Sequence, residues 1–416
     1  MQCCGRPRCR CCPTFVSRWQ RSFPDSDQRP HCRQKVWRAT SISSEVRSMS
    51  RGASFRTGMM VPVRVAYTLE QCWHRVPGGT GVAALRTAEA LASIEGIELV
   101  GLAGRHRHGP EVDWTPSIPW VELSIGSPWL YETWLRCNWP KAESATGPVD
   151  VVHATTLIPC PTKHPLIVTL HDLAFLHSPD QFTRHGVRIF KRSLELTKRN
   201  ADLVLCCSQA TMDDCVVAGI SADRLRHVPL GVDLEQATVL DLARVRSVYQ
   251  LPEKYLLFVG TVEPRKNLRG LAQAVEMLDD PIPLVVVGAD GWGDVAVDIA
   301  GDVTFLGFVP TEDLWALYAG AEVFCYPSSL EGYGLPVLEA MAQGTPVVTS
   351  MDTATEEAAG GAAVLVDPAD VVDIARGITE ARARRDELAV LGRQRAAKAT
   401  WKHTAELTAA AYRELK

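Results

Sequence analysis

The sequence lacks any stretch that approaches the roughly 20 uninterrupted apolar residues needed to cross a bilayer. It also has little net charge, because 44 Lys and Arg stand against 48 Asp and Glu, and the acidic excess lies after residue 58. This balance argues against nucleic acid as a general partner. With 46% hydrophobic and 22% charged residues over 416 positions, the chain reads as a globular protein of two domains, soluble or bound to a membrane surface.

The first 58 residues are poor in acidic side chains and have no apolar core of a secretory signal. Eleven Arg and one Lys stand there against three acidic residues. Cys9 and Cys12 form a C-x-x-C pair, but no second pair and no C-x-x-C-H follows, which argues against a zinc or haem site. We expect residues 1–58 to be a disordered leader, or to precede a true start at Met59 or Met60.

The cysteines after this segment are scattered through apolar surroundings. Such a pattern predicts reduced thiols in the core of a cytosolic protein. These cysteines are Cys72, Cys137, Cys160, Cys206, Cys207, Cys215 and Cys325.

From Val63 onward short apolar runs alternate with longer amphipathic ones, which is typical of parallel sheets with crossover helices. The first series of runs is VRVAYT, IELVGLAG, VDVVHAT, PLIVTLH and LVLCCS, and the second is YLLFVG, PLVVVG, VTFLG, VFCYPS, PVVTS and AAVLV. We predict an α/β protein with two tandem Rossmann-like, doubly wound domains that face each other across a cleft.

The expected boundaries follow from these two series. Residues 59–240 form the N-terminal domain, and residues 241–398 form the C-terminal domain. The segment 231–252 is the expected linker, and residues 399–416 form a helix that packs back on the first domain.

The strongest motif is SSLEGYGLPVLEAMAQGTPVV, from Ser328 to Val348, which follows an apolar strand and leads into a helix. Backbone N–H groups around Gly334 and Leu335, together with the positive end of the helix dipole, form a site for a diphosphate. Glu331 and Glu339 supply acceptor-only carboxylates for sugar hydroxyls and a ribose diol. The alternative is a pair of solvated surface acids.

A second motif, FVGTVEPRKNL, again puts a polar turn at the carboxyl end of a strand. Arg265 and Lys266 in this turn are suited to neutralise phosphate charge as a leaving group departs. The alternative is a charged first turn of a surface helix.

The E-x7-E element, the E-P-R-K-N turn and the L-V-D-P near Asp367 together resemble the large retaining glycosyltransferase family called family 4, which has the GT-B fold. The resemblance runs from about Val63 to the C-terminus. It implies that residues 59–240 are the acceptor-side domain and residues 241–398 the nucleotide-sugar-binding domain. It also implies that Arg265 and Lys266 bind the donor diphosphate, Glu339 the ribose and Glu331 the transferred sugar. It also implies that the enzyme needs no metal and no cofactor. Many members carry a proline before the glutamate that matches Glu357, and this chain does not, so Glu357 is given no role.

In the first domain Pro77 to Gly81 precedes a helix, and Gly79 and Gly81 offer backbone donors to a phosphate. The same residues match the dinucleotide pattern G-x-G-x-x-A, but they do not follow their strand directly, which disfavours NAD. The family has a glycine-rich loop here and a histidine near the transferred sugar, which implies a role for His171 in hydrogen bonding to that sugar. A structural histidine is the alternative.

Two surface features point to the acceptor without identifying it. Five tryptophans lie between Trp114 and Trp139 (Trp114, Trp120, Trp129, Trp134 and Trp139), and they suit stacking on a sugar, contact with lipid headgroups, or packing of an irregular segment. The predicted helix 184–200 is basic on one side, with Glu195 its single acidic residue. That side suits an anionic membrane surface, although a solvated face is the better prediction.

The expected activity is transfer of a hexose, with mannose favoured, from a nucleotide diphosphate sugar with retention of configuration. GDP-mannose is favoured over UDP-sugars, and the acceptor is a glycan, a lipid-linked compound or a small molecule in cell-envelope or polysaccharide biosynthesis. A 2-epimerase of the same fold and a non-catalytic nucleotide-sugar-binding or glycan-binding protein remain as alternatives. We expect a cytoplasmic location, with peripheral association at the inner face of the plasma membrane as an option.

Overall fold

The computed structural model describes residues 62–416, apart from 75–76, 128 and 290–300. These residues belong to one compact unit, Met59–Lys416. The expectations for residues 1–58, including the Cys9 and Cys12 pair, and for a start at Met59 or Met60 lie outside the described residues.

The first domain is built on a parallel sheet that has seven strands among the described residues, in the order β3-β2-β1-β4-β5-β6-β7. Its strands are β1 (Val63–Thr68), β2 (Ile97–Ala103), β3 (Trp120–Glu122), β4 (Val151–Ala154), β5 (Leu166–Leu170), β6 (Leu203–Cys206) and β7 (Leu225–His227). Strands β4 and β6 are buried along their whole length, because helices cover both faces of the sheet. Side chains of successive residues therefore enter two separate cores, as Val151 and Val152 do.

The second domain contains a parallel sheet with six strands in the described part of the chain, in the order β10-β9-β8-β11-β12-β13. Its strands are β8 (Leu256–Val259), β9 (Leu284–Val287), β10 (Val303–Gly307), β11 (Val323–Tyr326), β12 (Val347–Ser350) and β13 (Val364–Val366). In both sheets the strand order reverses beside the first strand of the domain, between β1 and β4 and between β8 and β11. In doubly wound sheets the loops at the carboxyl ends of the strands diverge at such a point, which is where ligands usually bind. The predicted pair of doubly wound domains is confirmed.

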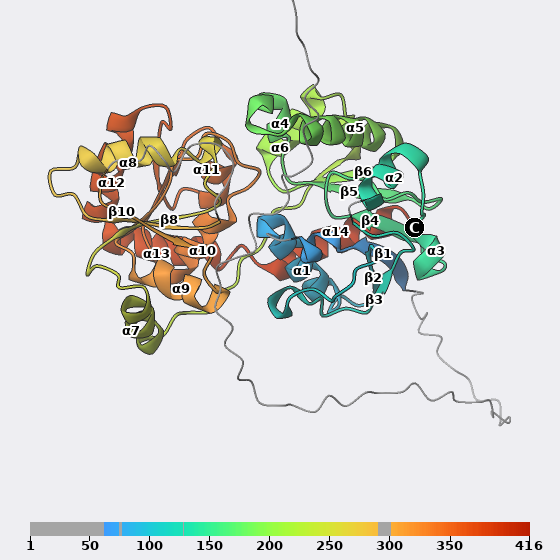
Figure 1. The fold of residues 1–416 in the computed structure, drawn as a ribbon, viewed down its shortest axis with the longest axis horizontal. Coiled ribbons are helices and arrows are strands. Elements are labelled where there is room, and N and C mark those ends of the chain that lie inside the picture. The colour runs from blue at the N-terminus through green and yellow to red at the C-terminus, as the bar shows by residue number, and fades with distance from the viewer. Residues whose placement is uncertain (1–61, 75–76, 128, 290–300) are drawn as a thin grey trace, which may run out of the picture. The chain divides into compact units, whose positions relative to one another are not determined.

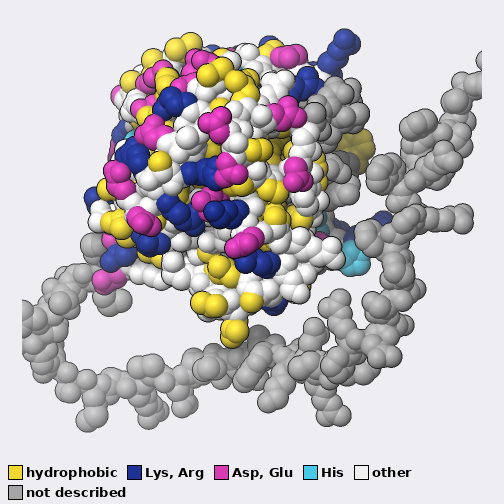
Figure 2. Space-filling model, turned by 90° about the vertical axis from the view of Figure 1, so that its left-hand side faces the viewer, with side chains coloured by type: hydrophobic (Ala, Val, Ile, Leu, Met, Phe, Trp, Pro, Cys, Tyr) yellow, Lys and Arg dark blue, Asp and Glu magenta, His cyan; other side chains and the backbone are white. Residues whose placement is uncertain are grey.

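Helices cover both sheets (Figure 1). In the first domain they are α1 (Gly78–Leu91), α2 (Trp129–Cys137), α3 (Glu143–Thr146), α4 (Ala174–His177), α5 (Arg184–Asn200) and α6 (Gln209–Val217), with 3-10 turns η1 (Glu70–Trp73), η2 (Val112–Trp114), η3 (Pro179–Gln181) and η4 (Ala222–Arg224). After them come α7 (Val239–Val248), η5 (Pro264–Lys266), α8 (Leu268–Glu276), α9 (Thr311–Gly320), α10 (Leu335–Gln343), α11 (Ala354–Ala359), α12 (Val371–Ala383), α13 (Arg385–Ala396) and α14 (Trp401–Glu414). The surface over α12 and α8 mixes acidic and basic side chains (Figure 2), many of them in ion pairs such as Arg382 with Asp280.

The segment 231–252, predicted as the linker between the domains, contains helix α7. Thr238 and Asp241 form a capping box that begins the helix. Tyr249, just after it, donates a hydrogen bond of 2.6 Å to Asp313 of α9, which fixes α7 against the second domain.

Helix α14 returns from the second domain and packs against α1 of the first. The Tyr412 hydroxyl lies 2.7 Å from His153 Nδ1, and both side chains are buried. Among the helices that the structure describes, none is long and apolar enough to span a membrane.

Candidate functional site

The candidate site begins where β8 and β11 end, at the crevice of the second sheet. The turn η5 follows β8 and carries Arg265 and Lys266, and Asn267 ends the turn in the left-handed region with a φ of 55°. The amide of Asn267 donates 2.7 Å to the carbonyl of Pro368, so the L-V-D-P motif supports this turn from behind. The loop after β11 carries Ser328 and Glu331.

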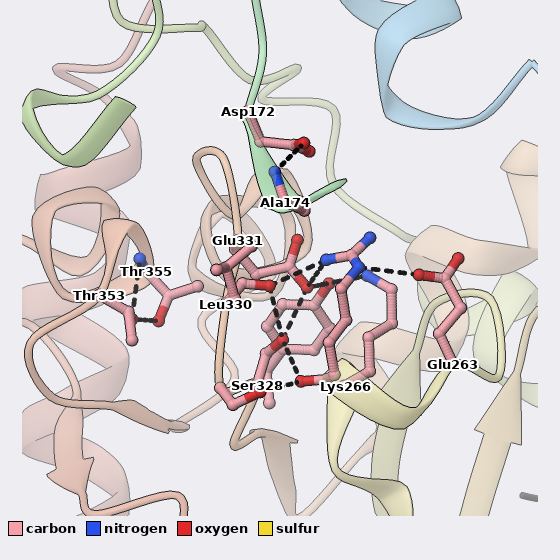
Figure 3. A network of polar contacts seen from close by, with 12 residues as sticks. Asp172, Ala174, Glu263, Lys266, Ser328, Leu330, Glu331, Thr353 and Thr355 are labelled. Carbon is pink, nitrogen blue, oxygen red and sulfur yellow. Dashed lines mark hydrogen bonds and ion pairs between the residues drawn. The ribbon is translucent and has the colours of Figure 1, made fainter. Parts of the chain in front are cut away.

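The two loops meet in a compact group of charged and polar side chains (Figure 3). Lys266 Nζ and Arg265 Nη1 each lie 3.0 Å from Glu331 Oε1. The same oxygen accepts hydrogen bonds from the hydroxyls of Ser328 at 2.8 Å and Tyr326 at 3.0 Å. Arg265 Nε also pairs with Glu263 at 2.8 Å. The two motifs are therefore in direct contact.

The contacts to Glu331 within the described residues all fall on Oε1, so this oxygen anchors the side chain. Oε2 of the same carboxylate takes no part in these contacts, and an ionised carboxylate oxygen can accept further hydrogen bonds. Lys266 and Arg265 are mostly enclosed, with side chains 9% and 16% exposed, so their charges act in a poorly solvated setting.

The pKa values in this group are set by burial and by the opposite charges. Burial alone would raise the pKa of Glu331, but Lys266 and Arg265 outweigh it and lower that pKa to about 2. For Lys266 and Arg265 burial acts in the opposite direction and would lower their pKa values. The Glu331 carboxylate outweighs burial and raises both pKa values above their ordinary values. All three groups are therefore ionised at neutral pH.

Helix α10 begins beside this group. Its cap, Gly334, has a φ of 111°, a conformation that L side chains rarely adopt, and a Cβ there would lie 3.0 Å from Thr355 Cγ2. Pro336 occupies the first turn, where its missing N–H costs nothing. The N–H groups of Gly334 and Leu335 and the positive end of the helix dipole are thus available to an anion.

Glu339 lies one turn into α10. Its Oε2 accepts a hydrogen bond of 2.8 Å from the Tyr318 hydroxyl of α9. Burial is the main cause that raises the pKa of Glu339 to about 7, and the charge of Asp233 raises it further. The hydrogen bond from Tyr318 lowers the pKa by less than burial raises it. Glu339 and Leu335 line a cavity of about 340 Å³ together with Trp114, Trp315 and Trp401 among other residues. This carboxyl therefore faces a space large enough for part of a ligand.

His171 follows β5 in the first domain and lies against the Glu331 loop. A Cβ on Gly332 would come within 1.9 Å of the His171 carbonyl oxygen, so only glycine permits this approach. Cys207 Sγ and Thr211 Oγ1 lie within hydrogen-bond distance of both the His171 and the Gly332 carbonyls, at 3.2 to 3.4 Å. The structure therefore brings the histidine motif and the E-G-Y-G motif together.

The glycine-rich segment of the first domain differs from its prediction as a loop before a helix. Helix α1 begins at Gly78, so Gly79 and Gly81 belong to its first turn. The N–H of Gly81 donates to Pro77 at 3.2 Å, and a Cβ on Gly81 would meet Pro77 at 2.6 Å, so Gly81 acts here in packing. Gly79 lies at the start of the helix, and a Cβ on it would lie 3.7 Å from Leu335 Cδ1.

The remaining sequence features separate into buried and exposed groups. Trp134 is buried, whereas Trp129 and Trp139 are 68% and 50% exposed. Among the residues that the structure describes, the seven cysteines are free and all but Cys137 are buried. The described residues contain no cluster of three or more His, Cys, Asp or Glu side chains arranged to hold a metal ion.

Sequence reasoning did not single out the neutral partners of Glu331. Ser328 lay inside the quoted motif, so its place three residues before Glu331 was an available signal. Tyr326 was assigned only to a strand, and nothing in its position along the chain indicates that its hydroxyl lies 2.5 Å from Lys266 Nζ.

Comparison with known proteins extends this description to the family. Residues 243–398 match the family of glycosyl transferases group 1, and residues 77–236 match Glycosyltransferase Family 4. The chain is 34% identical to the O-antigen chain mannosyltransferase B of Escherichia coli over 267 residues. This alignment covers 60% of this chain and 70% of that protein. It is 29% identical over 288 residues to the serotype-specific mannosyltransferase WbdA of Escherichia coli, covering 62% of this chain but only 33% of that longer protein.

Solved structures agree on the fold. Anabaena HepE in complex with UDP and glucose superimposes with a TM-score of 0.64 at 19% identity, covering 85% of this chain and 100% of that one. Sucrose-phosphate synthase from Thermosynechococcus elongatus gives 0.66 at 22% identity, with 85% and 99% covered. At such identities the likeness concerns the fold alone. From the sequence relatives and from the two facing Rossmann-like domains, we conclude that this chain is a member of the group 1 glycosyltransferases with the GT-B fold.

Proposed function

We propose that the protein transfers a hexose, with mannose favoured, from a nucleotide diphosphate sugar to a glycan, lipid-linked or small-molecule acceptor in cell-envelope or polysaccharide biosynthesis, with retention of configuration. The observation that carries this proposal is the Glu331 carboxylate, held through one oxygen by Arg265 and Lys266 beside the start of α10. The names of the mannosyltransferase relatives favour mannose, and hence GDP-mannose over UDP-sugars.

The donor diphosphate binds between the two cations and the start of α10. Arg265 and Lys266 supply positive charge, and the N–H groups of Gly334 and Leu335 supply hydrogen bonds. Gly79, at the start of α1, is close to Leu335 and adds a second helix start on the opposite side. Because negative charge grows on the diphosphate as the sugar departs, these groups stabilise the transition state more than the bound donor. This positive charge replaces a metal ion and no cofactor takes part.

The sugar and the ribose are held by the two carboxylates. Glu331 Oε2 accepts from hydroxyls of the transferred hexose, and His171, which lies against the same loop, hydrogen-bonds to that sugar. Glu339 accepts from the ribose diol inside the cavity that it lines. The spacing of the E-x7-E motif thus serves two parts of one donor.

The chemical step is a substitution on one face of the sugar. The bond between C1 and the diphosphate oxygen breaks, and the acceptor oxygen forms its bond to C1 on the same face. The proton of the acceptor hydroxyl passes to the departing diphosphate, which therefore serves as the base. Closure of the domains excludes water and limits hydrolysis of the donor.

The acceptor side suggests contact with an anionic membrane surface. Helix α5 exposes Arg184, Arg188, Lys191 and Arg192, and α2 beside it begins with the exposed Trp129. Basic side chains near an aromatic group suit the headgroup region of an anionic leaflet. We therefore infer a cytoplasmic enzyme that works at the inner face of the plasma membrane.

The test is donor turnover with GDP-mannose and with UDP-glucose, in the presence and absence of EDTA and of methyl mannoside or mannose oligosaccharides as acceptors. We expect acceptor-dependent release of GDP that persists in EDTA and a product with the anomeric configuration of the donor. Arg265→Ala should abolish turnover, and Arg384→Ala, on the exposed surface, should not. Epimerisation of the donor without acceptor, or binding without turnover, would contradict the proposal in favour of the epimerase or the binding protein.

A further inference from the structure

A buried polar network joins the ends of β1 and β4 at the crevice of the first sheet. Thr68 ends β1, Gln71 lies in η1 and Thr155 follows β4, and all three side chains are at most 4% exposed. Gln71 Nε2 lies 2.7 Å from Thr155 Oγ1, and Thr155 Oγ1 lies 2.7 Å from the Thr68 carbonyl oxygen. Neither the sequence motifs nor the proposed donor contacts use these residues.

The directions of these hydrogen bonds follow from the chemistry of the groups. A carbonyl oxygen can only accept, so the Thr155 hydroxyl donates its proton to Thr68. Its remaining lone pairs must then accept, which requires the NH₂ group of Gln71 to face it. The backbone N–H of Thr155 donates to Thr68 Oγ1 at 3.0 Å. Thr155 is therefore held through its hydroxyl and its amide, and its peptide groups have little freedom.

The carbonyl of Thr155 is the partner of His171. His171 Nε2 lies 3.1 Å from that oxygen, which can only accept, so Nε2 carries the proton and donates the hydrogen bond. Burial lowers the pKa of His171, which keeps the ring neutral at neutral pH. In a neutral ring with the proton on Nε2, Nδ1 is an acceptor. The Thr155 carbonyl thus decides which nitrogen of His171 can accept a hydrogen bond from a hydroxyl.

We propose that Gln71 is a positioning residue for His171, and that it fixes the Nε2–H form of the imidazole by holding Thr155 in place. This inference rests on the proposed function, in which His171 hydrogen-bonds to the transferred hexose. A bond of 3.1 Å is near the long end of the 2.7–3.2 Å range of N–H···O bonds. A small rotation of the Thr155 peptide therefore suffices to break it and release the ring.

The first experiment reads the ring directly. The protein is labelled at full length with ¹⁵N-histidine, and the His171 NMR signals are assigned by their loss in His171→Ala. In the wild type these signals should show that the proton is on Nε2. Gln71→Met keeps the length of the side chain but removes the amide, and it should raise the Nδ1–H population. Gln343→Met removes another buried amide, in α10 of the second domain, which donates a hydrogen bond of 2.6 Å to the Glu235 carbonyl. It should leave the His171 signals unchanged.

The second experiment measures coupling in donor turnover. Gln71→Met should lower kcat about tenfold, less than the ~hundredfold that a misplacement of a full ångström can cause, with KM for the donor little changed. In the His171→Ala background the same substitution should change kcat by less than about twofold, because two residues that act through one another are not additive. Equal losses in both backgrounds would overturn the proposal.

A second pair of variants keeps the test decisive if Gln71→Met does not fold. Thr155→Ser retains the hydroxyl and should behave as wild type, whereas Thr155→Val should reproduce the change in His171 signals and in kcat. If His171→Ala keeps full turnover, the assignment of His171 in the proposed function fails. If His171→Ala loses turnover but none of the Gln71 or Thr155 variants shifts the ring proton, the proposed function stands and the positioning role is refuted.

Discussion

Replacement of Glu331 by glutamine gives the sharpest test of the charged group. Glu331→Gln keeps the shape of the side chain and one acceptor oxygen for Ser328 and Tyr326. It removes the negative charge that Lys266 and Arg265 both contact at 3.0 Å. Those two cations are mostly buried, so water replaces the lost partner poorly.

The magnitude follows from the pKa of Glu331, which the two cations lower from 4.5 to about 2 against the effect of burial. That difference corresponds to about 3 kcal/mol in favour of the folded state when the carboxyl is ionised. Because the folded pKa lies below the unfolded one, this stabilisation is present above pH 4.5 and is lost as the pH falls towards 2. Glu331→Gln should therefore lower the free energy of unfolding by about 3 kcal/mol at pH 7 and by about 2 kcal/mol at pH 3.5.

Urea denaturation of both proteins at the two pH values measures this difference. Glu98→Gln is the control, because Glu98 pairs with Arg64 on the surface and its side chain is 52% exposed; such a pair contributes about 0–1 kcal/mol. Donor turnover by Glu331→Gln should fall about hundredfold, the effect of losing about 2.7 kcal/mol from the transition state. Equal stability of wild type and Glu331→Gln at pH 7, or a stability difference that grows at low pH, would refute the assigned charge arrangement.

Three further outcomes are expected. Because the pKa of Glu339 is raised to about 7, KM for the donor should rise as the pH falls from 8 to 6, whereas Glu339→Gln should show a higher KM that does not vary with pH in initial-rate measurements. Gly332→Ala puts a Cβ 1.9 Å from the His171 carbonyl oxygen, so kcat should fall about hundredfold while the circular dichroism spectrum stays near wild type. In sedimentation with vesicles containing phosphatidylserine, Lys191→Glu and Trp129→Ala should each reduce binding at low salt, and unchanged binding would remove the membrane inference.

The fold was predictable from the sequence because its central strands are continuous apolar runs. All six strands of the second sheet coincide with such runs, for example Leu256–Val259 within YLLFVG. The short edge strands Trp120–Glu122 and Leu225–His227 were not predicted, since three residues with no apolar continuity carry little pattern. Helix α7 was missed because Val239 and Leu240 are exposed and no clear apolar stripe marks a buried face; its capping box was the available signal.

The charged part of the candidate site was predictable for a topological reason. Arg265 and Glu331 follow two strands that are neighbours in a parallel sheet, so their loops had to meet. The contact of Gly332 with His171 was not predictable, because it depends on how the two domains pack. The packing role of Gly81 was also hidden, since the same residues would fit a phosphate loop if the helix began later.

The neutral partners of Glu331 explain how one carboxylate can serve both the empty and the occupied site. Without a donor, Glu331 and Glu263 balance the charges of Arg265 and Lys266, so the buried group is close to neutral. In the proposed reaction the diphosphate brings further negative charge and binds the same two cations. Ser328 and Tyr326 do not change charge, and they continue to hold Oε1 while the cations turn to the phosphates.

Because Glu331 and Glu263 already balance the charges of Arg265 and Lys266, the negative charge of the diphosphate needs further positive compensation. In the proposed donor complex, the N–H groups of Gly334 and Leu335 at the start of α10 supply this compensation. Ser328→Ala removes the hydroxyl that holds Glu331, and this loss should weaken the donor complex more than the free protein. In kcat measurements and urea denaturation, Ser328→Ala should therefore reduce kcat strongly and the free energy of unfolding only slightly. A residue that only supports the fold would show the reverse.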